Sequence, residues 1–152
     1  MAIKINGGST TYASTFSASP TAERTITVPD ASFTLAGTDA AQTFSAAQRG
    51  TVSTLTDGAT ITPDFAVANN FSVTLGGNRT LANPSNLTAG QSGVIIINQD
   101  GTGSRTLAYG SYFDFGGATA PTLTTAASSQ DMIAYFVVST TRINCVFTGD
   151  LR

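Results

Sequence analysis

The sequence predicts an all-β protein, and three observations lead to that prediction. Gly, Asn, Asp and Pro recur about every eight to twelve residues, as they do at turns. Between them lie short runs of β-branched and aromatic residues that alternate with polar ones, which is the period of a half-buried strand. Good helix formers gather in one short stretch only. We expect an antiparallel β-sandwich or barrel, preceded by an extended, β-rich amino-terminal attachment segment.

The first third of the chain contains three candidate strands, at residues 10–16, 25–28 and 32–36. Residues 39–48 follow and hold most of the helix formers, so a short helix or turn is expected there, ended by Gly50. We take this stretch as a hinge. It divides the chain into an attachment or oligomerisation segment, residues 1–50, and a carboxy-terminal β module, residues 51–152.

The β module begins with a clearly alternating strand. Phe71, Val73 and Leu75 fall on one face and are expected to point inward, while hydroxyl residues fall on the other. Near the end of the chain, residues 142–148 follow a Ser-Thr-Thr turn. They are expected to form a closing hairpin with the preceding strand.

Two other runs, residues 94–97 and 132–138, are apolar on both faces, which in a sheet requires cover on both sides. In so short a chain, a neighbouring subunit is the expected second cover. The second of these runs therefore supplies a candidate oligomer interface, made of Met132, Ile133, Tyr135, Phe136 and Val138.

The scarcity of charge points the same way. Charged residues make up 11% of the chain, against roughly 25% in typical soluble domains. Because burying an unpaired ion is costly, interface cores are depleted of charge. We expect an obligate homo-oligomer; a monomer with a surface rich in Ser and Thr is the alternative.

Net charge and hydropathy bear on the partners. The net charge is −2, Lys4 is the single lysine, and the six arginines are scattered, so neither nucleic acid nor a membrane surface is an expected partner. No apolar run approaches the ~20 residues that a membrane span needs. The first residues also lack the apolar stretch of a secretory signal.

The residue types needed for catalysis are scarce. The chain has no His, a single Glu, Glu23, and a single Cys, Cys145, which stands in an alternating run and is expected to be a small buried hydrophobe. We expect no catalytic residue and no enzyme; a two-carboxylate glycosidase whose acids meet across an interface is the alternative.

No cofactor and no metal site is expected either. Residues 98–103 carry several oxygen ligands suited to calcium, but they lack the repeated carboxylates of a calcium loop and favour a Gly-rich turn.

An aromatic group precedes the last strands. Tyr109, Tyr112 and Phe113, with Phe115 close by, stand among glycines in a context typical of loops. Flat rings with hydrogen-bonding tips suit carbohydrate faces, so the first three are candidate glycan contacts. Packing in the core is the other interpretation, and the two stay open.

Several segments together resemble proteins of tailed-phage particles. Residues 25–37 read TITVPDASFTLAG and residues 39–45 read DAAQTFS, similar to units that recur in tail-fibre and related virion proteins. A longer match is similar to a carboxy-terminal β module of many phage structural proteins. It comprises residues 78–84 (NRTLANP), 89–93 (AGQSG), 103–110 (GSRTLAYG) and 120–123 (APTL).

The resemblance implies a trimeric, β-rich component of the virion surface, made in the host bacterial cytoplasm. Long tail fibres carry an extended shaft and a variable tip, and this sequence has neither. We therefore expect a head fibre or a trimeric capsid decoration protein that binds the major capsid protein. A short tail fibre protein that binds a host surface glycan is the alternative.

Overall fold

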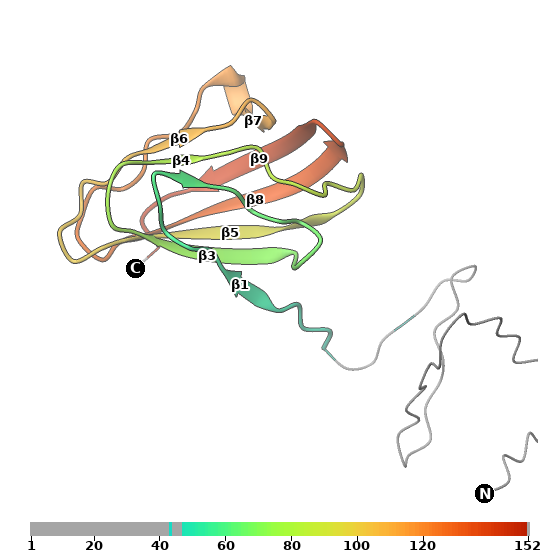
Figure 1. Ribbon diagram of the computed structural model, residues 1–152, viewed down its shortest axis with the longest axis horizontal. Coiled ribbons are helices and arrows are strands. Elements are labelled where there is room, and N and C mark those ends of the chain that lie inside the picture. Colours follow the sequence, from blue (N-terminus) through green and yellow to red (C-terminus); the bar gives the residue numbers. More distant parts are fainter. Residues whose placement is uncertain (1–42, 44–46, 152) are drawn as a thin grey trace, which may run out of the picture. The chain divides into compact units, whose positions relative to one another are not determined.

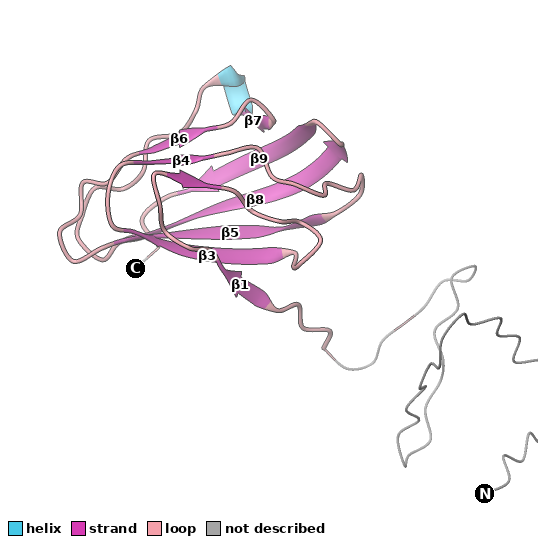
Figure 2. Cartoon of the chain, viewed as in Figure 1, coloured by secondary structure: helices cyan, strands magenta, loops and turns pink. Residues whose placement is uncertain are grey.

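The computed structural model describes Thr43 and residues 47–151, and these residues form an all-β structure (Figure 1). The chain divides between Thr43 and Phe44 into two units, and every element below belongs to the second. Figure 2 shows strands throughout the described part, where the one helical element is a short 3-10 turn, η1. The predicted all-β class is confirmed. The expected strands at 10–16, 25–28 and 32–36, and most of the expected helix at 39–48, lie outside the described residues.

The described elements follow one another in this order: β1 (Val52–Thr54), β2 (Thr60–Ile61), β3 (Asn70–Leu75), β4 (Arg79–Leu81), β5 (Ser92–Gln99), β6 (Leu107–Tyr109), β7 (Phe113–Phe115), η1 (Gly116–Ala118), β8 (Gln130–Ser139) and β9 (Arg142–Thr148).

The strands form two sheets. The large sheet has six strands in the order β1-β3-β5-β8-β9-β7, and the small sheet has three in the order β2-β4-β6. From β1 to β6 the chain alternates between the two sheets, with β1, β3 and β5 in the large sheet and β2, β4 and β6 in the small one. Neighbouring strands of a sheet are therefore separated in sequence by one strand of the other sheet, and they run parallel (Figure 1). These strands make three coils of a flattened solenoid. The hairpin of β8 and β9 then extends the large sheet.

The direction of pairing differs from the antiparallel pattern that we expected. Of the seven strand pairings among the described residues, five are parallel, and the two antiparallel ones join β8 to β5 and to β9. The alternation of apolar and polar residues along a strand shows which face of the strand is buried. This pattern is the same whether the strand pairs parallel or antiparallel with its neighbour. Parallel neighbours need a long crossover, and for the four parallel pairs among β1 to β6 a strand of the other sheet provides it; between β7 and β9 the chain passes through β8 of the same sheet.

Two local predictions are confirmed. Phe71, Val73 and Leu75 of β3 are buried, while the residues between them are not. Strands β8 and β9 pair antiparallel across a two-residue turn, with Tyr135 opposite Cys145.

The core lies between the two sheets. Its buried side chains come from both of them: the small sheet contributes Ile61, Leu81 and Leu107, and the large sheet contributes Phe71, Val73, Leu75, Ile95, Ile97, Phe113, Ile133, Tyr135, Val137, Ile143 and Cys145. Phe65 stacks on both Phe71 and Tyr135, with ring centroids 5.4 and 4.7 Å away. One face of the large sheet is thus covered by the small sheet, and the other face points away from the core.

Candidate functional site

The outer face of the large sheet, turned away from the core, is the first candidate site. The strand register places its side chains in rows that cross the sheet. One row runs Val52, Asn70, Val94, Ala134, Val146, and the next runs Thr54, Ser72, Ile96, Met132, Thr148. Phe136 lies beside these rows, opposite Ser92 and Asn144. Apolar residues of β5, β8 and β9 therefore meet at the centre of this face.

We call this centre the apolar patch; it consists of Val94, Ile96, Met132, Ala134, Phe136 and Val146. Phe136 keeps 50% of its surface exposed and Val146 keeps 67%, although both stand in the middle of regular strands. Val138 and Val52, on the same face, are exposed by 41% and 49%. Four of the six large hydrophobic residues that are exposed in the described part thus lie on this face.

Polar groups border the apolar patch on two sides. On one side, the Gln130 amide donates a hydrogen bond to Asn98 Oδ1 over 2.9 Å. On the other, Arg142 forms an ion pair of 2.6 Å with Asp114, next to Asn144. A groove of about 490 Å³ runs along this second border, between Phe136 and the residues Phe115 and Gly116. An apolar centre within a polar rim is the usual anatomy of a protein interface.

The predicted interface residues are divided between the two faces of β8. Met132, Phe136 and Val138 lie on the outer face, whereas Ile133 and Tyr135 are buried in the core of the same subunit. Successive residues of a strand point to opposite faces, so only every second residue of an apolar run is available to a partner. Val94 and Ile96 stand beside them in the register, and both belong to the run at 94–97 for which we expected cover by a neighbouring subunit. Val146 of β9 lies opposite Ala134 and was not among the predicted interface residues.

The aromatic group forms a cluster of rings instead of a flat platform. Tyr109 packs edge to face against Phe113, 6.2 Å away, and against Phe115, 4.8 Å away. Phe113 is buried in the core, and Tyr109 and Tyr112 are partly exposed. The Tyr109 hydroxyl is buried without a hydrogen-bond partner in the described part of the chain, and this burial raises its pKa. The structure thus gathers two of the three predicted residues, Tyr109 and Phe113, into one ring cluster with Phe115, while Tyr112 packs against the core.

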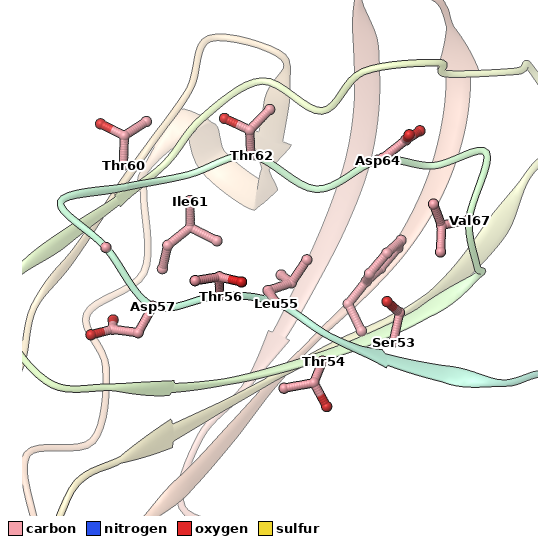
Figure 3. Close-up of a pocket in the computed structure, with 12 residues that line it drawn as sticks. Ser53, Thr54, Leu55, Thr56, Asp57, Thr60, Ile61, Thr62, Asp64 and Val67 are labelled. Atoms are coloured by element: carbon pink, nitrogen blue, oxygen red, sulfur yellow. The ribbon is translucent and has the colours of Figure 1, made fainter.

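A second depression of about 490 Å³ lies between the segments that carry β1 and β2. Figure 3 shows Leu55 and Ile61 pointing between the two segments, while Thr60 and Thr62 point away. Its two carboxyl groups already have partners: Asp57 forms a bidentate pair with Arg79, at 2.8 and 2.7 Å, and Asp64 accepts a hydrogen bond of 2.7 Å from Asn86. These bonds lower the pKa of both groups. Both acids are therefore ionised near neutral pH, unlike a general acid.

The residues 98–103, weighed above as a calcium loop, form a turn held by their own side chains. Asp100 Oδ1 accepts hydrogen bonds from the backbone of Thr102 and Gly103, and Oδ2 pairs with Arg105 over 2.8 Å. The Arg105 guanidinium, followed by these backbone bonds, lowers the pKa of Asp100 to about 2. Gln99 exchanges two hydrogen bonds with the backbone of Arg105. The Asp100 oxygens are thus engaged in the turn, and no group of three acidic, His or Cys side chains gathers in the described residues.

A family model described as "putative phage tail fibre C-terminal domain" matches residues 61–136, half of the 152-residue chain. The chain belongs to this family. The resemblance to phage tail-fibre proteins is thereby confirmed, and the tail fibre family is a structural one, so the protein is a structural component of a phage virion. The matched region runs from β2 into β8 and ends at Phe136 of the apolar patch.

Two other comparisons found nothing: no curated protein and no solved structure matched the chain. Within the described residues of this tail fibre domain, no helix is long and apolar enough to cross a membrane.

Proposed function

We propose that this chain is a fibre protein of the phage tail, which works by assembling with itself and with other virion proteins and not by turnover of a substrate. The match to the tail fibre C-terminal domain family carries this proposal. In the depression between β1 and β2, Asp57 and Asp64 are ionised and already hydrogen-bonded to Arg79 and Asn86. This supports the proposal that the protein does not turn over a substrate.

The position of the protein on the phage particle, tail or capsid, is a separate part of the proposal. From the sequence alone we preferred a head fibre or capsid decoration protein bound to the major capsid protein, with a short tail fibre as the alternative. The family description concerns tail fibres, and it therefore supports the tail position. The capsid position is the competing outcome of the experiment below.

The proposed assembly is a homotrimer. A closed symmetric oligomer gives each copy the same contacts. The low content of charged residues, 11%, and the exposed apolar residues of the large sheet support self-association. Met132, Phe136 and Val138 are the predicted interface residues that a partner reaches without unfolding the module.

Gold-labelled antibodies against the purified protein, applied to intact phage and viewed by electron microscopy, test the position. Label along or at the end of the tail is expected. Label over the head would support capsid decoration, and particles without label would contradict a place on the virion surface. Particles from a phage that lacks the gene provide the control for antibody specificity.

Host glycan binding by the aromatic group stays a prediction, and the partial exposure of Tyr109 and Tyr112 favours it. Binding of the purified chain to a bacterial glycan array should be lost in Tyr112→Ala and kept in Val67→Ala, which changes an exposed side chain outside the aromatic group. Equal binding by both variants would remove the aromatic group from consideration.

A further inference from the structure

We infer that the apolar patch on the outer face of the large sheet is the surface on which a second copy of this chain packs. The inference rests on the proposed self-assembly, and it adds the surface, the residues and the partner. Four properties of the patch lead to this inference.

The patch is continuous across three strands. Val94 of β5 lies opposite Ala134 of β8, which lies opposite Val146 of β9. Ile96 lies opposite Met132 in the neighbouring row. Cross-strand neighbours on one face have β-carbons about 5 Å apart, so these side chains form one surface and not scattered exposed residues.

The outer face of the small sheet provides the contrast. Its residues are Thr60, Thr80 and Ala108, which the register places in a single row. This face carries no large apolar side chain, although it belongs to the same module and the same core. The apolar character is therefore specific to one outer face and does not follow from a generally apolar surface.

The charge distribution in and around the apolar patch indicates which kind of partner fits it. The patch itself holds no ionisable residue, and the nearest charges on its border, Arg142 and Asp114, neutralise each other over 2.6 Å. An acidic or basic partner would find no matching charge there. A surface that is itself neutral and apolar suits the patch, and the same face of the other copies has that composition when the faces of a trimer meet around its threefold axis.

The face is large enough for a stable contact. The six strands have between three and ten residues each, and at about 4.8 Å between strands and 3.3 Å per residue they give a face of roughly 590 Å². Stable specific interfaces bury from about 600 Å² on each partner upward. The whole face of one copy therefore offers the area at the lower end of that range.

The test compares Ala134→Arg, at the centre of the patch, with the matched control Ala108→Arg on the outer face of the small sheet, both in the full-length chain. Light scattering after size-exclusion chromatography should give the oligomer for the unchanged chain and for the control. Arginine at position 134 would place a charge in the buried interface, so Ala134→Arg should elute as a folded monomer, with association weakened roughly a hundredfold or more.

The possible outcomes distinguish an error in the proposed surface from an error in the proposed self-assembly. An oligomeric Ala134→Arg chain would overturn this surface while leaving self-assembly intact, and a monomeric unchanged chain would overturn both. Neither result bears on the position on the phage particle, which the gold label measures independently.

A cross-linking experiment covers the case in which Ala134→Arg does not fold. The single cysteine of the chain, Cys145, is 6% exposed, so an introduced thiol on the surface reacts first. A short bis-maleimide should link copies of Ala134→Cys and leave copies of Ala108→Cys unlinked. The reverse pattern would place the interface on the small sheet and contradict the inference.

Discussion

Gly93 lies where β5 passes closest to the backbone of Asn69. A β-carbon at position 93 would overlap the carbonyl oxygen of Asn69, and it would also come within 3.0 Å of the Tyr135 hydroxyl. That hydroxyl donates a hydrogen bond of 2.7 Å to the same carbonyl oxygen. Three segments thus meet at one carbonyl group, and only a residue without a side chain fits between them.

Gly93→Ala should therefore lower the free energy of unfolding by about 3 kcal/mol, since the backbone of Asn69 must move and the hydrogen bond must stretch. Urea unfolding at a fixed protein concentration measures the change. Gly101→Ala is the matched control, because a β-carbon there meets nothing within 4 Å. Equal stability of the two variants would show that the strand relaxes at no cost.

Two buried groups should make the fold sensitive to alkali. Burial raises the pKa of Tyr135 from 10.0 to about 12, and burial, followed by the charge of Asp114, raises that of Cys145 from 9.0 to about 12. Both groups are neutral in the fold and ionise more readily in the unfolded chain. Their contribution to stability is complete below about pH 9 and is lost as the pH rises toward 12.

We expect the free energy of unfolding of the unchanged chain to fall between pH 9 and 12. The Tyr135→Phe variant should be less stable than the unchanged chain by about 1 kcal/mol at pH 8, because the carbonyl oxygen of Asn69 loses its hydrogen-bond donor. Between pH 8 and pH 11 the free energy of unfolding should fall less for the variant than for the unchanged chain. Unfolding by urea at both pH values gives the comparison. Parallel pH profiles for the two chains would mean that the Tyr135 hydroxyl does not contribute to the alkaline loss.

At the scale of the elements, a buried carboxylate joins β8 to two segments distant in the chain. Asp131 is 1% exposed, and its two oxygens accept hydrogen bonds from the backbone N–H of Thr124, over 2.8 Å, and of Asp150, over 2.9 Å. These bonds connect β8 to the loop before it and to the residues after β9. A buried oxygen acceptor between two backbone donors is a strong local constraint.

Asp131→Asn should reduce the free energy of unfolding by about 2 kcal/mol, because the amide replaces one acceptor by a donor that faces a backbone N–H. Loosening of the carboxy-terminal residues should appear as faster hydrogen exchange of the Asp150 amide. Asp114→Asn is the control: its ion pair with Arg142 is well exposed to solvent, so a loss within about 0.5 kcal/mol is expected. A similar loss in both variants would contradict the special role of Asp131.

At the scale of the whole molecule, the described residues have a core of their own. Its buried side chains come from both sheets, between Ile61 and Cys145. All the strands that enclose it begin at or after Val52. The predicted boundary between residues 1–50 and 51–152 stays a prediction, and this core suggests how to test it.

A fragment starting at Thr51 should fold, with a cooperative thermal transition and the far-ultraviolet circular dichroism of β-structure. The matched control is a fragment starting at Asn70, which lacks β1 and β2 and so the edge strand of each sheet; it should lose cooperativity. A Thr51 fragment without a cooperative transition would place the boundary elsewhere.

Features of the fold that depend on residues close together in the sequence were predictable. Alternation at Phe71, Val73 and Leu75 identified β3 and its buried face, and a turn flanked by apolar runs identified the hairpin of β8 and β9. The direction of pairing was not predictable in this way. Side-chain alternation is the same in parallel and antiparallel strands, and nothing local marks a strand as the crossover between two others.

The sequence by itself determined the all-β class, the scarcity of charge and the phage resemblance, because composition, period-two patterns and motifs are local properties of the chain. Only the tertiary structure decided which apolar side chains are buried and which remain on the surface. It placed Ile133 and Tyr135 in the core and left Phe136 and Val146 outside. It also brought β5, β8 and β9 side by side, so that residues from distant parts of the chain form one apolar patch. The physical reason is that a surface depends on strand order and register, which arise from contacts between segments far apart in sequence.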